Sequence, residues 1–428
     1  MTRKATLPLR EGRKSEAFSG RGTSPARACP LPEICGASLA NYRPSLKGRV
    51  VLCALLAFIT PALAAPGVTP TEITVGTHVD LSGPLSQMGA AVRNGLKMGF
   101  DEANARGGAW GRKVTLVTVD NGYDPDRALA AEKNELAPER IFAILAPVGT
   151  PPVAASMPAF VNAGVLHLFP FTAADDTYVP RQPLEFALDL PVSDQMRIGL
   201  KALLAHGGKR VGVLYRDDAF GRLVLAGVQR ELQRLGARAP IAERFKPGAA
   251  AMTHQLATLH AGGADIVVIG GVAQEAFAAM KSARRWSPAF LCPSACYVPQ
   301  VPTLGGRAVA GLYTVAAAPI PYPDDPDPAL RVWAKRYEAK FHTVASAEAF
   351  RAYLDARLFA EVLRRAGPDL SRARFASALE AMPPWRDPAY GEPAVDFTTR
   401  DHIGFHTGFL AQVKGARWIT IASTSSKR

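Results

Sequence analysis

The sequence has few cysteines, and most of them lie near its start. Five of the 428 residues are cysteine, and only Cys292 and Cys296 follow residue 64. Two cysteines are too few for a structural zinc site, which uses four ligands. A disulfide between them would close a very small loop and requires Cα atoms within about 7 Å. The sequence leaves open whether this pair is oxidised.

Enzyme signatures are missing as well. No Gly-x-Gly-x-x-Gly follows a strand pattern, and no Gly-x-Ser-x-Gly elbow occurs. The stretch GGAWGRK at 107–113 follows a helix pattern and lacks the Ser or Thr that a phosphate-binding loop has after its lysine. Asp401, His402 and His406 alternate with apolar residues, so we interpret them as surface or core groups rather than metal ligands. The sequence therefore predicts no catalytic residue, metal or cofactor.

Positive charge is concentrated in the first 64 residues of the chain. The net charge is +13, and residues 1–64 carry +7 of it with ten basic and three acidic residues. The rest has an excess of only +6, which argues against a nucleic-acid-binding protein. An apolar content of 48% is typical of a globular protein.

A secretory signal explains the start of the chain. The basic segment 47–49 precedes the apolar run VVLCALLAFITPALA at 50–64, which ends in Ala-Leu-Ala and predicts cleavage after Ala64. The run is too short to span a bilayer comfortably, and Leu rather than a small residue precedes Cys53, which argues against a lipid anchor. We interpret residues 1–46 as the product of a translation start set too early, with a separate targeting segment as the alternative. We expect a soluble protein exported to the periplasm.

Apolar strand patterns alternate with helix patterns along the remaining chain. Nearly all-apolar strands separated by helices predict parallel sheets covered on both faces, and hence an α/β fold. The alternation runs twice, which predicts two doubly wound parallel-sheet lobes with a hinge and an interlobe ligand cleft. We expect lobe 1 at 65–190 plus 319–390, and lobe 2 at 191–318 plus 391–428. Expected helices include 87–104, 220–235, 328–341 and 346–366, and the last expected strands are 394–398, 404–413 and 417–422.

Four landmarks in order resemble a known family. They are Leu81-Ser82-Gly83-Pro84, Asn104-Ala105-Arg106-Gly107-Gly108, Asp120 with Asp124-Pro125, and Asp217-Asp218-Ala219-Phe220-Gly221. Over about 72–422 the chain resembles type I periplasmic binding proteins, in the branch that includes the leucine/isoleucine/valine-binding proteins of ABC importers. The resemblance implies a monomer without catalysis or cofactor, which closes its lobes over a small carboxylate and presents it to a membrane permease. The alternatives are a sensory receptor subunit of the same fold and, third, a secreted amidase or other enzyme.

The resemblance also implies a ligand site. In the family, the turns after the third and fourth strands hold the ligand carboxylate through backbone N–H and hydroxyl groups; here these turns are 148–150 and 170–172. Thr150 and Thr172 would supply hydroxyls, with helix capping as the alternative reading. The candidate ligand-binding residues are Ser82, Met88, Val148, Gly149, Thr150, Pro170, Phe171, Thr172, Phe220, Val272 and Ser294.

Two departures from the family bear on the ligand class. Amino-acid binders keep an acidic residue and an aromatic one on the second lobe, and these positions correspond to Ser294 and Val272. An ammonium buried without a counter-charge costs several kcal/mol. We therefore expect an apolar or aromatic acid rather than an α-amino acid, unless Asp217, Asp218 or Glu275 points inward instead of capping a helix or facing solvent.

Overall fold

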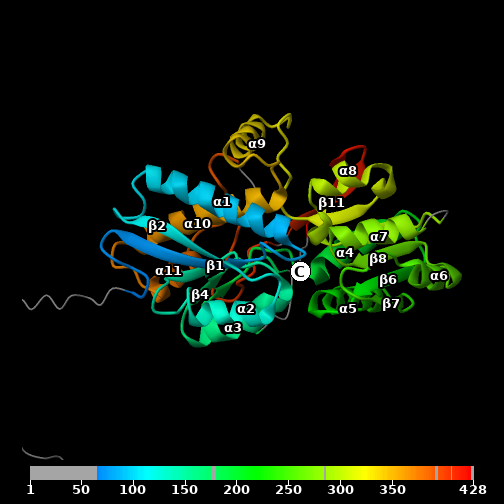
Figure 1. Cartoon of the computed structure of the whole chain (residues 1–428), viewed down its shortest axis with the longest axis horizontal. Helices are drawn as coiled ribbons and strands as arrows, with labels where there is room; N and C mark the ends of the chain where they lie inside the picture. The colour runs from blue at the N-terminus through cyan, green and yellow to red at the C-terminus, as the bar shows by residue number, and fades with distance from the viewer. Residues whose placement is uncertain are drawn as a thin grey trace, which may run out of the picture. The chain divides into compact units, whose positions relative to one another are not determined.

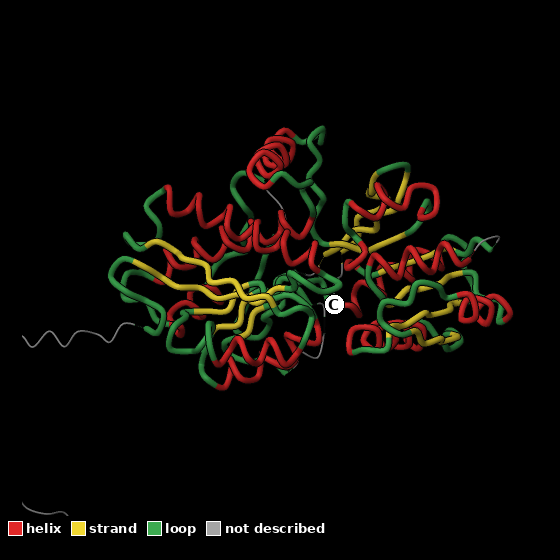
Figure 2. Tube along the Cα trace, viewed as in Figure 1, coloured by secondary structure: helices red, strands yellow, loops and turns green. Residues whose placement is uncertain are grey.

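The computed structural model describes residues 65–172, 174, 180–283, 286–390, 394–405 and 407–425 (Figure 1). The predicted signal peptide and the segment before it lie outside these residues. Two sheets and their helices make up the described chain (Figure 2). Within the described residues, no helix is long and apolar enough to cross a membrane.

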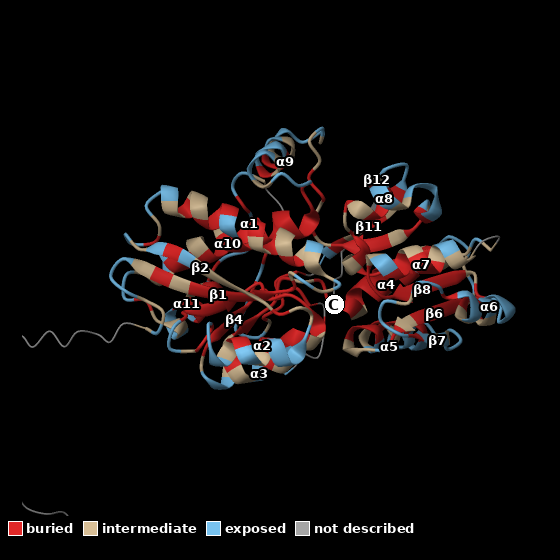
Figure 3. Cartoon of the chain, in the orientation of Figure 1, coloured by how far each residue is buried: buried red, intermediate tan, exposed pale blue. Residues whose placement is uncertain are grey.

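The first lobe is built on a five-stranded parallel sheet of order β2-β1-β3-β4-β5. Figure 1 shows α1 and α10 on one side of it and α2 and α3 on the other. Because helices cover both faces, strands such as β3 and β4 are buried along their whole length (Figure 3). The elements are β1 (Glu72–Val79), α1 (Ser86–Ala105), β2 (Lys113–Asp120), α2 (Pro125–Lys133), β3 (Ala143–Leu145), α3 (Thr150–Asn162), β4 (Leu166–Leu168) and β5 (Glu185–Phe186).

The second lobe has a seven-stranded sheet of order β12-β11-β10-β9-β8-β6-β7. Strands β6 to β10 run parallel, and β11 and β12 add an antiparallel edge. All five residues of β8 are buried, as expected for a central parallel strand. The elements are α4 (Val192–Ala205), β6 (Val211–Arg216), α5 (Ala219–Arg234), β7 (Ile241–Phe245), α6 (Thr253–Ala261), β8 (Ile266–Gly270), α7 (Ala273–Ala283), β9 (Ala289–Cys292), α8 (Gln300–Gly305), β10 (Tyr313–Ala316), β11 (Thr407–Lys414) and β12 (Arg417–Ser425). Short 3-10 turns occupy Ser294–Cys296 and Gly306–Val309.

Between β10 and β11 the chain returns to the first lobe. This return carries α9 (Pro328–Phe341), α10 (Ala347–Ala366) and α11 (Arg372–Glu380), and it continues through residues 394–405. Phe397 stacks on Phe169 of the first lobe with ring centroids 5.9 Å apart and meets Phe186 edge-on at 5.5 Å. The lobe boundary predicted at residue 390 therefore differs from the observed packing, in which the chain leaves the first lobe just before β11. The strand expected at 394–398 is reduced to one isolated bridge between Trp385 and Val395.

Glycines on α1 allow α10 to approach closely. A Cβ at Gly95 would overlap the carbonyl oxygen of Ala349, and one at Gly99 would lie 2.6 Å from the Cβ of Ala356. Neither contact distance is tolerated, so glycine is needed for this helix spacing. The side chain of Ser346 caps α10 by accepting the N–H of Ala349 at 3.2 Å. These contacts fix the N-terminal turn of α10, which reaches the cavity described next.

Candidate ligand-binding site

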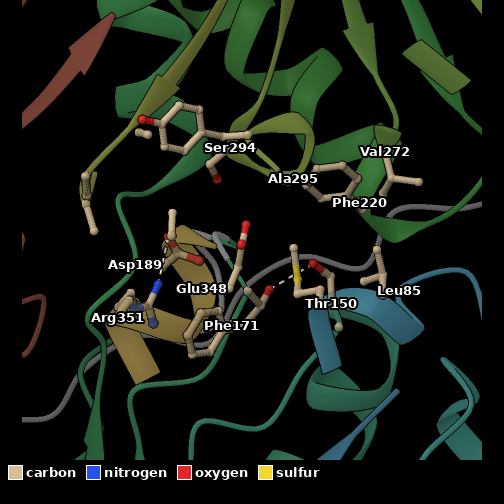
Figure 4. Close-up of a pocket in the computed structure, with 18 of the residues that line it drawn as sticks. Leu85, Thr150, Phe171, Asp189, Phe220, Val272, Ser294, Ala295, Glu348 and Arg351 are labelled. Carbon is tan, nitrogen blue, oxygen red and sulfur yellow. Dashed lines mark hydrogen bonds and ion pairs between the residues drawn. The ribbon is translucent and has the colours of Figure 1, made fainter. Parts of the chain in front are cut away.

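A cavity lies where the carboxyl ends of strands from both sheets meet. Its volume is about 730 Å³ including the open mouth. Figure 4 shows Thr150, Phe171, Asp189, Glu348 and Arg351 on the first-lobe side, facing second-lobe residues. This position is the one expected for ligands of open α/β sheets.

A pair of threonine hydroxyls lies at one end of the first-lobe wall. Thr150 is the first residue of α3 and Thr172 follows β4; their Oγ1 atoms are 2.8 Å apart, and both residues are buried. Pro151 and Pro152 carry no N–H, so Thr150 provides the only backbone donor among the first three residues of α3. When Thr172 donates to Thr150, the hydroxyl proton of Thr150 is directed to a third group. The pair can thus donate an O–H and an N–H to a ligand oxygen.

Gly149 suits this turn better than the serine usual in the family. Its φ is +104°, in the region that favours glycine. A Cβ there would lie 3.0 Å from the Pro152 ring and 3.1 Å from the Tyr123 ring. The Gly149 N–H is already used, since it donates to the Phe171 carbonyl at 3.3 Å.

Arg351 on α10 brings a buried cation to the cavity, but its nitrogens are engaged within the protein. Its guanidinium lies 3.9 Å above the Phe171 ring centroid. It pairs with Asp189 at 3.2 Å and with Asp355 at 3.7 Å, and Nη2 donates to the carbonyls of Phe169 and Pro170 at 3.3 Å. Burial raises the pKa of Asp355 to about 7, against the lowering effect of Arg351. Arg351 therefore holds the first-lobe side of the cavity in place and does not offer a free guanidinium to a ligand.

Glu348, in the first turn of α10, is the other ionisable group at this end. Glu348 is only 7% exposed, and its Oε2 has no hydrogen-bond partner among the described residues. Burial raises the pKa of Glu348 to about 7, although its own N–H and the nearby Ser346 hydroxyl lower it. A carboxylate of the first lobe thus lines the cleft, whereas the acids considered from the sequence, Asp217, Asp218 and Glu275, all belong to the second lobe.

The second-lobe wall is mainly apolar and is braced by a disulfide. Figure 4 shows Phe220, Val272, Ser294 and Ala295 along it. Cys292 is bonded to Cys296 with Cα atoms 6.0 Å apart, which settles the question left open by the sequence. The bond spans Ser294, whose N–H donates to the side-chain oxygen of Gln195 at 2.8 Å. The turn carrying Ser294 and Ala295 is therefore held from two sides.

The three acids considered as counter-charges have other partners. Asp217 is exposed and pairs with Arg222 and Arg244. Asp218 caps α5 through the Gly221 N–H, and Glu275 accepts the N–H groups of Gly248 and Val272; both also pair with Arg216. None of the three lines the cavity.

Arg216 also links the lobes. It lies 5.1 Å from the ring centroid of Tyr123, which belongs to the first lobe and lines the cavity. Tyr123 has a φ of +62°, which is rare for a residue with a Cβ. Burial raises the pKa of Tyr123 above its usual range, so the phenol stays neutral. The contact joins the two sides at the cavity edge.

Most of the predicted site residues come together in this cavity. Those that line it are Met88, Gly149, Thr150, Phe171, Thr172, Phe220, Val272 and Ser294. Three do not line it: Ser82 accepts a hydrogen bond from Arg127, Val148 pairs through its main chain with His78 and Asn121, and Pro170 accepts from Arg351. Sequence reasoning missed Leu85, Tyr123, Asp189, Ala295, Tyr297, Ala316, Ala317, Ala318, Ala347, Glu348 and Arg351.

His402, weighed in the sequence as a metal ligand, is buried beside two acidic residues. Its Nδ1 lies 2.6 Å from the Glu185 carbonyl oxygen and its Nε2 lies 2.9 Å from Glu380 Oε1. Its ring stacks on Phe186 at 3.8 Å. His406 lies outside the described residues. Within the part of the chain that the structure describes, no group of three or more His, Cys, Asp or Glu residues is arranged to hold a metal.

Comparison with known proteins agrees with this architecture. A family model described as periplasmic binding protein matches residues 72–417. The Leu/Ile/Val-binding protein BraC3 of Rhizobium johnstonii is 25% identical over 225 residues, which is 52% of this chain and 60% of that protein. The Leu/Ile/Val-binding protein of Escherichia coli is 23% identical over 273 residues, covering 63% and 72%. The chain thus spans about three fifths of the length of the first curated relatives it matches.

Solved structures show the same fold over more of the chain. A substrate-binding periplasmic protein from Ralstonia solanacearum is 26% identical with a TM-score of 0.73, covering 82% of this chain and all of that one. A fatty acid ABC transporter substrate-binding protein from Thermomonospora curvata is 21% identical with a TM-score of 0.75, covering 85% and 95%. The two-lobed fold, the cavity at the strand ends and the match over 72–417 together show that this chain belongs to the periplasmic binding protein family, a family of solute-binding proteins and not of enzymes.

Proposed function

We propose that this protein is the extracytoplasmic substrate-binding subunit of an ABC importer and that it binds a small carboxylate between its lobes. The observation that carries the proposal is the buried Thr150–Thr172 hydroxyl pair at the edge of an apolar cavity shared by both lobes. Hydroxyl and backbone donors at a helix N-terminus suit a carboxylate. The relatives named Leu/Ile/Val-binding proteins support a ligand of about this size.

The proposed binding mode uses both walls. The ligand carboxylate accepts one O–H from the Thr150–Thr172 pair and the N–H of Thr150, and its apolar body lies between Phe171 and Phe220. A ligand that touches both lobes lowers the free energy of the closed form relative to the open form. Hinge closure around a ligand is one of the common domain motions in proteins. In our proposal the closed form, in the periplasm and as a monomer, is the one that a membrane permease recognises.

A thermal-shift panel tests the ligand class. The exported protein is screened with leucine, phenylalanine, 4-methylpentanoate, 3-phenylpropionate and benzoate, and with glucose and putrescine as ligands without a carboxylate. A ligand at 100 times its Kd stabilises the folded state by about 2.7 kcal/mol, which raises the melting temperature measurably. We expect at least one carboxylate to do so. Stabilisation by glucose or putrescine alone would overturn the proposal.

Transport is tested separately. Deletion of the gene should abolish uptake of the ligand identified in the panel, and complementation should restore it. Normal uptake in the deletion strain would contradict the role in import while leaving binding itself intact.

A further inference from the structure

Glu348 lies at the junction of two cavities. It lines the main cavity, and together with Met88 it also lines a neighbouring cavity between α1, α9 and α10. The second cavity has a mixed lining that includes the polar residues Gln87, Asn94 and Gln300. A side chain at this position can reach a ligand in the main cavity (Figure 4).

The charges around Glu348 do not balance. Among the described residues lining the main cavity, Arg351 is the only cation, and it is paired with Asp189 and Asp355. Glu348 is therefore an additional acid with a buried oxygen that lacks a hydrogen-bond partner. Leaving a buried polar atom unpaired costs free energy, and an unpaired charge costs more. A ligand that supplies a donor at this point removes that cost.

We propose that the Glu348 carboxylate accepts a hydrogen bond from a positively charged group of the ligand, so that the ligand carries an ammonium as well as a carboxylate. The counter-charge then stands on α10 of the first lobe, not on the second lobe, where Ser294 faces the cavity. The inference rests on the proposed function, because the carboxylate is assigned to the Thr150–Thr172 pair. It replaces the expectation from the sequence that an amine is disfavoured.

Matched ligand pairs test this inference by calorimetry. Phenylalanine is compared with 3-phenylpropionate, and leucine with 4-methylpentanoate, since each pair differs only in the ammonium. In the unmodified protein the amino acid of at least one pair should bind at least tenfold more tightly. In Glu348→Gln this preference should fall to threefold or less, because the amide keeps the shape and removes the charge.

A control on the same helix keeps the comparison matched. Glu361→Gln changes a carboxylate of α10 that pairs with Arg364 and Arg365 away from the cavity, and it should leave the preference unchanged. Equal or tighter binding of the deaminated acid, or an unchanged preference in Glu348→Gln, would overturn the inference while the carboxylate site stands. If neither member of either pair binds although another carboxylate of the panel does, the inference about the ammonium fails and the carboxylate class stands; if no carboxylate binds, the proposed ligand class itself fails.

The pH dependence of the unmodified protein gives a second readout that does not depend on a variant folding. The ionisable groups facing Glu348 are Asp189, Arg351, Tyr297 and Tyr337. Burial raises the pKa values of both tyrosines, so they stay neutral between pH 5.5 and 8. An ammonium binds the ionised carboxylate, so below pH 7 affinity for the amino acid should fall by up to about tenfold per pH unit. Equal pH profiles for phenylalanine and 3-phenylpropionate would contradict the role of Glu348.

Discussion

Removal of one threonine hydroxyl tests the carboxylate site most directly. Thr172→Val keeps the shape of the side chain and removes Oγ1, which lies 2.8 Å from Thr150 Oγ1 and 3.4 Å from the Ala174 nitrogen. Thr172 is 3% exposed and Thr150 is 8% exposed. Little water can therefore replace the lost group.

The expected loss follows from the kind of hydrogen bond removed. A hydrogen bond to a charged group contributes about 1.5–3 kcal/mol, which corresponds to roughly a 10- to 150-fold increase in Kd. Folding should be affected less, by about 1 kcal/mol, since the Thr150 hydroxyl loses one neutral partner but still faces the cavity. Affinity should thus fall more than stability.

The assay is calorimetric titration with the carboxylate that gave the largest thermal shift, alongside urea unfolding of the ligand-free protein. Thr258→Val on α6 is the control: its hydroxyl donates to the His254 carbonyl at 3.3 Å, and Thr258 does not line the cavity. A Kd within twofold of the unmodified protein, with normal unfolding, would show that Thr172 only shapes the turn after β4.

Three further predictions concern stability and processing. Glu185 lies 3.9 Å from His167, too far for a hydrogen bond, and burial keeps both neutral: it raises the pKa of Glu185 to about 8 and lowers that of His167 to about 3. Between about pH 5 and 8 the folded state keeps a proton on Glu185 that the unfolded state releases, so the free energy of unfolding falls as pH rises. Glu185→Gln should reduce this slope, measured by urea unfolding, by up to about 1.4 kcal/mol per pH unit. Identical slopes in the two proteins would refute this. Gly95→Ala should destabilise the protein by about 1–3 kcal/mol, because the new methyl group would overlap the Ala349 carbonyl and push α10 away. Ligand binding should weaken as well, since α10 lines the cavity. An unchanged melting temperature would show that the two helices can shift without cost. N-terminal sequencing of the exported protein should find a start just after Ala64, and a longer N-terminus would contradict the predicted cleavage.

The sequence by itself determined the fold class and much of the cavity. The apolar run Ile266–Gly270 is typical of a strand buried on both faces, and its alternation with helices predicts parallel sheets. Thr150, Thr172 and Phe220 each lie in the turn or helix start that follows a strand, so their position at the carboxyl edge of a sheet was predictable from chain order. These features are local, and they depend on residue type and periodicity alone.

Tertiary structure decided which acid faces the ligand. The helix containing Glu348 and Arg351 was predicted, but most of its residues are buried, so the pattern does not show which of them face the cavity. That choice depends on the close contact of α10 with Gly95 of α1, two segments about 250 residues apart in the chain. Likewise, Glu275 is held by Arg216 and by the Gly248 N–H, both distant in the chain, as well as by the nearby Val272 N–H. Contacts between distant segments set the direction of each charged side chain, and periodicity along a single helix carries no information about them.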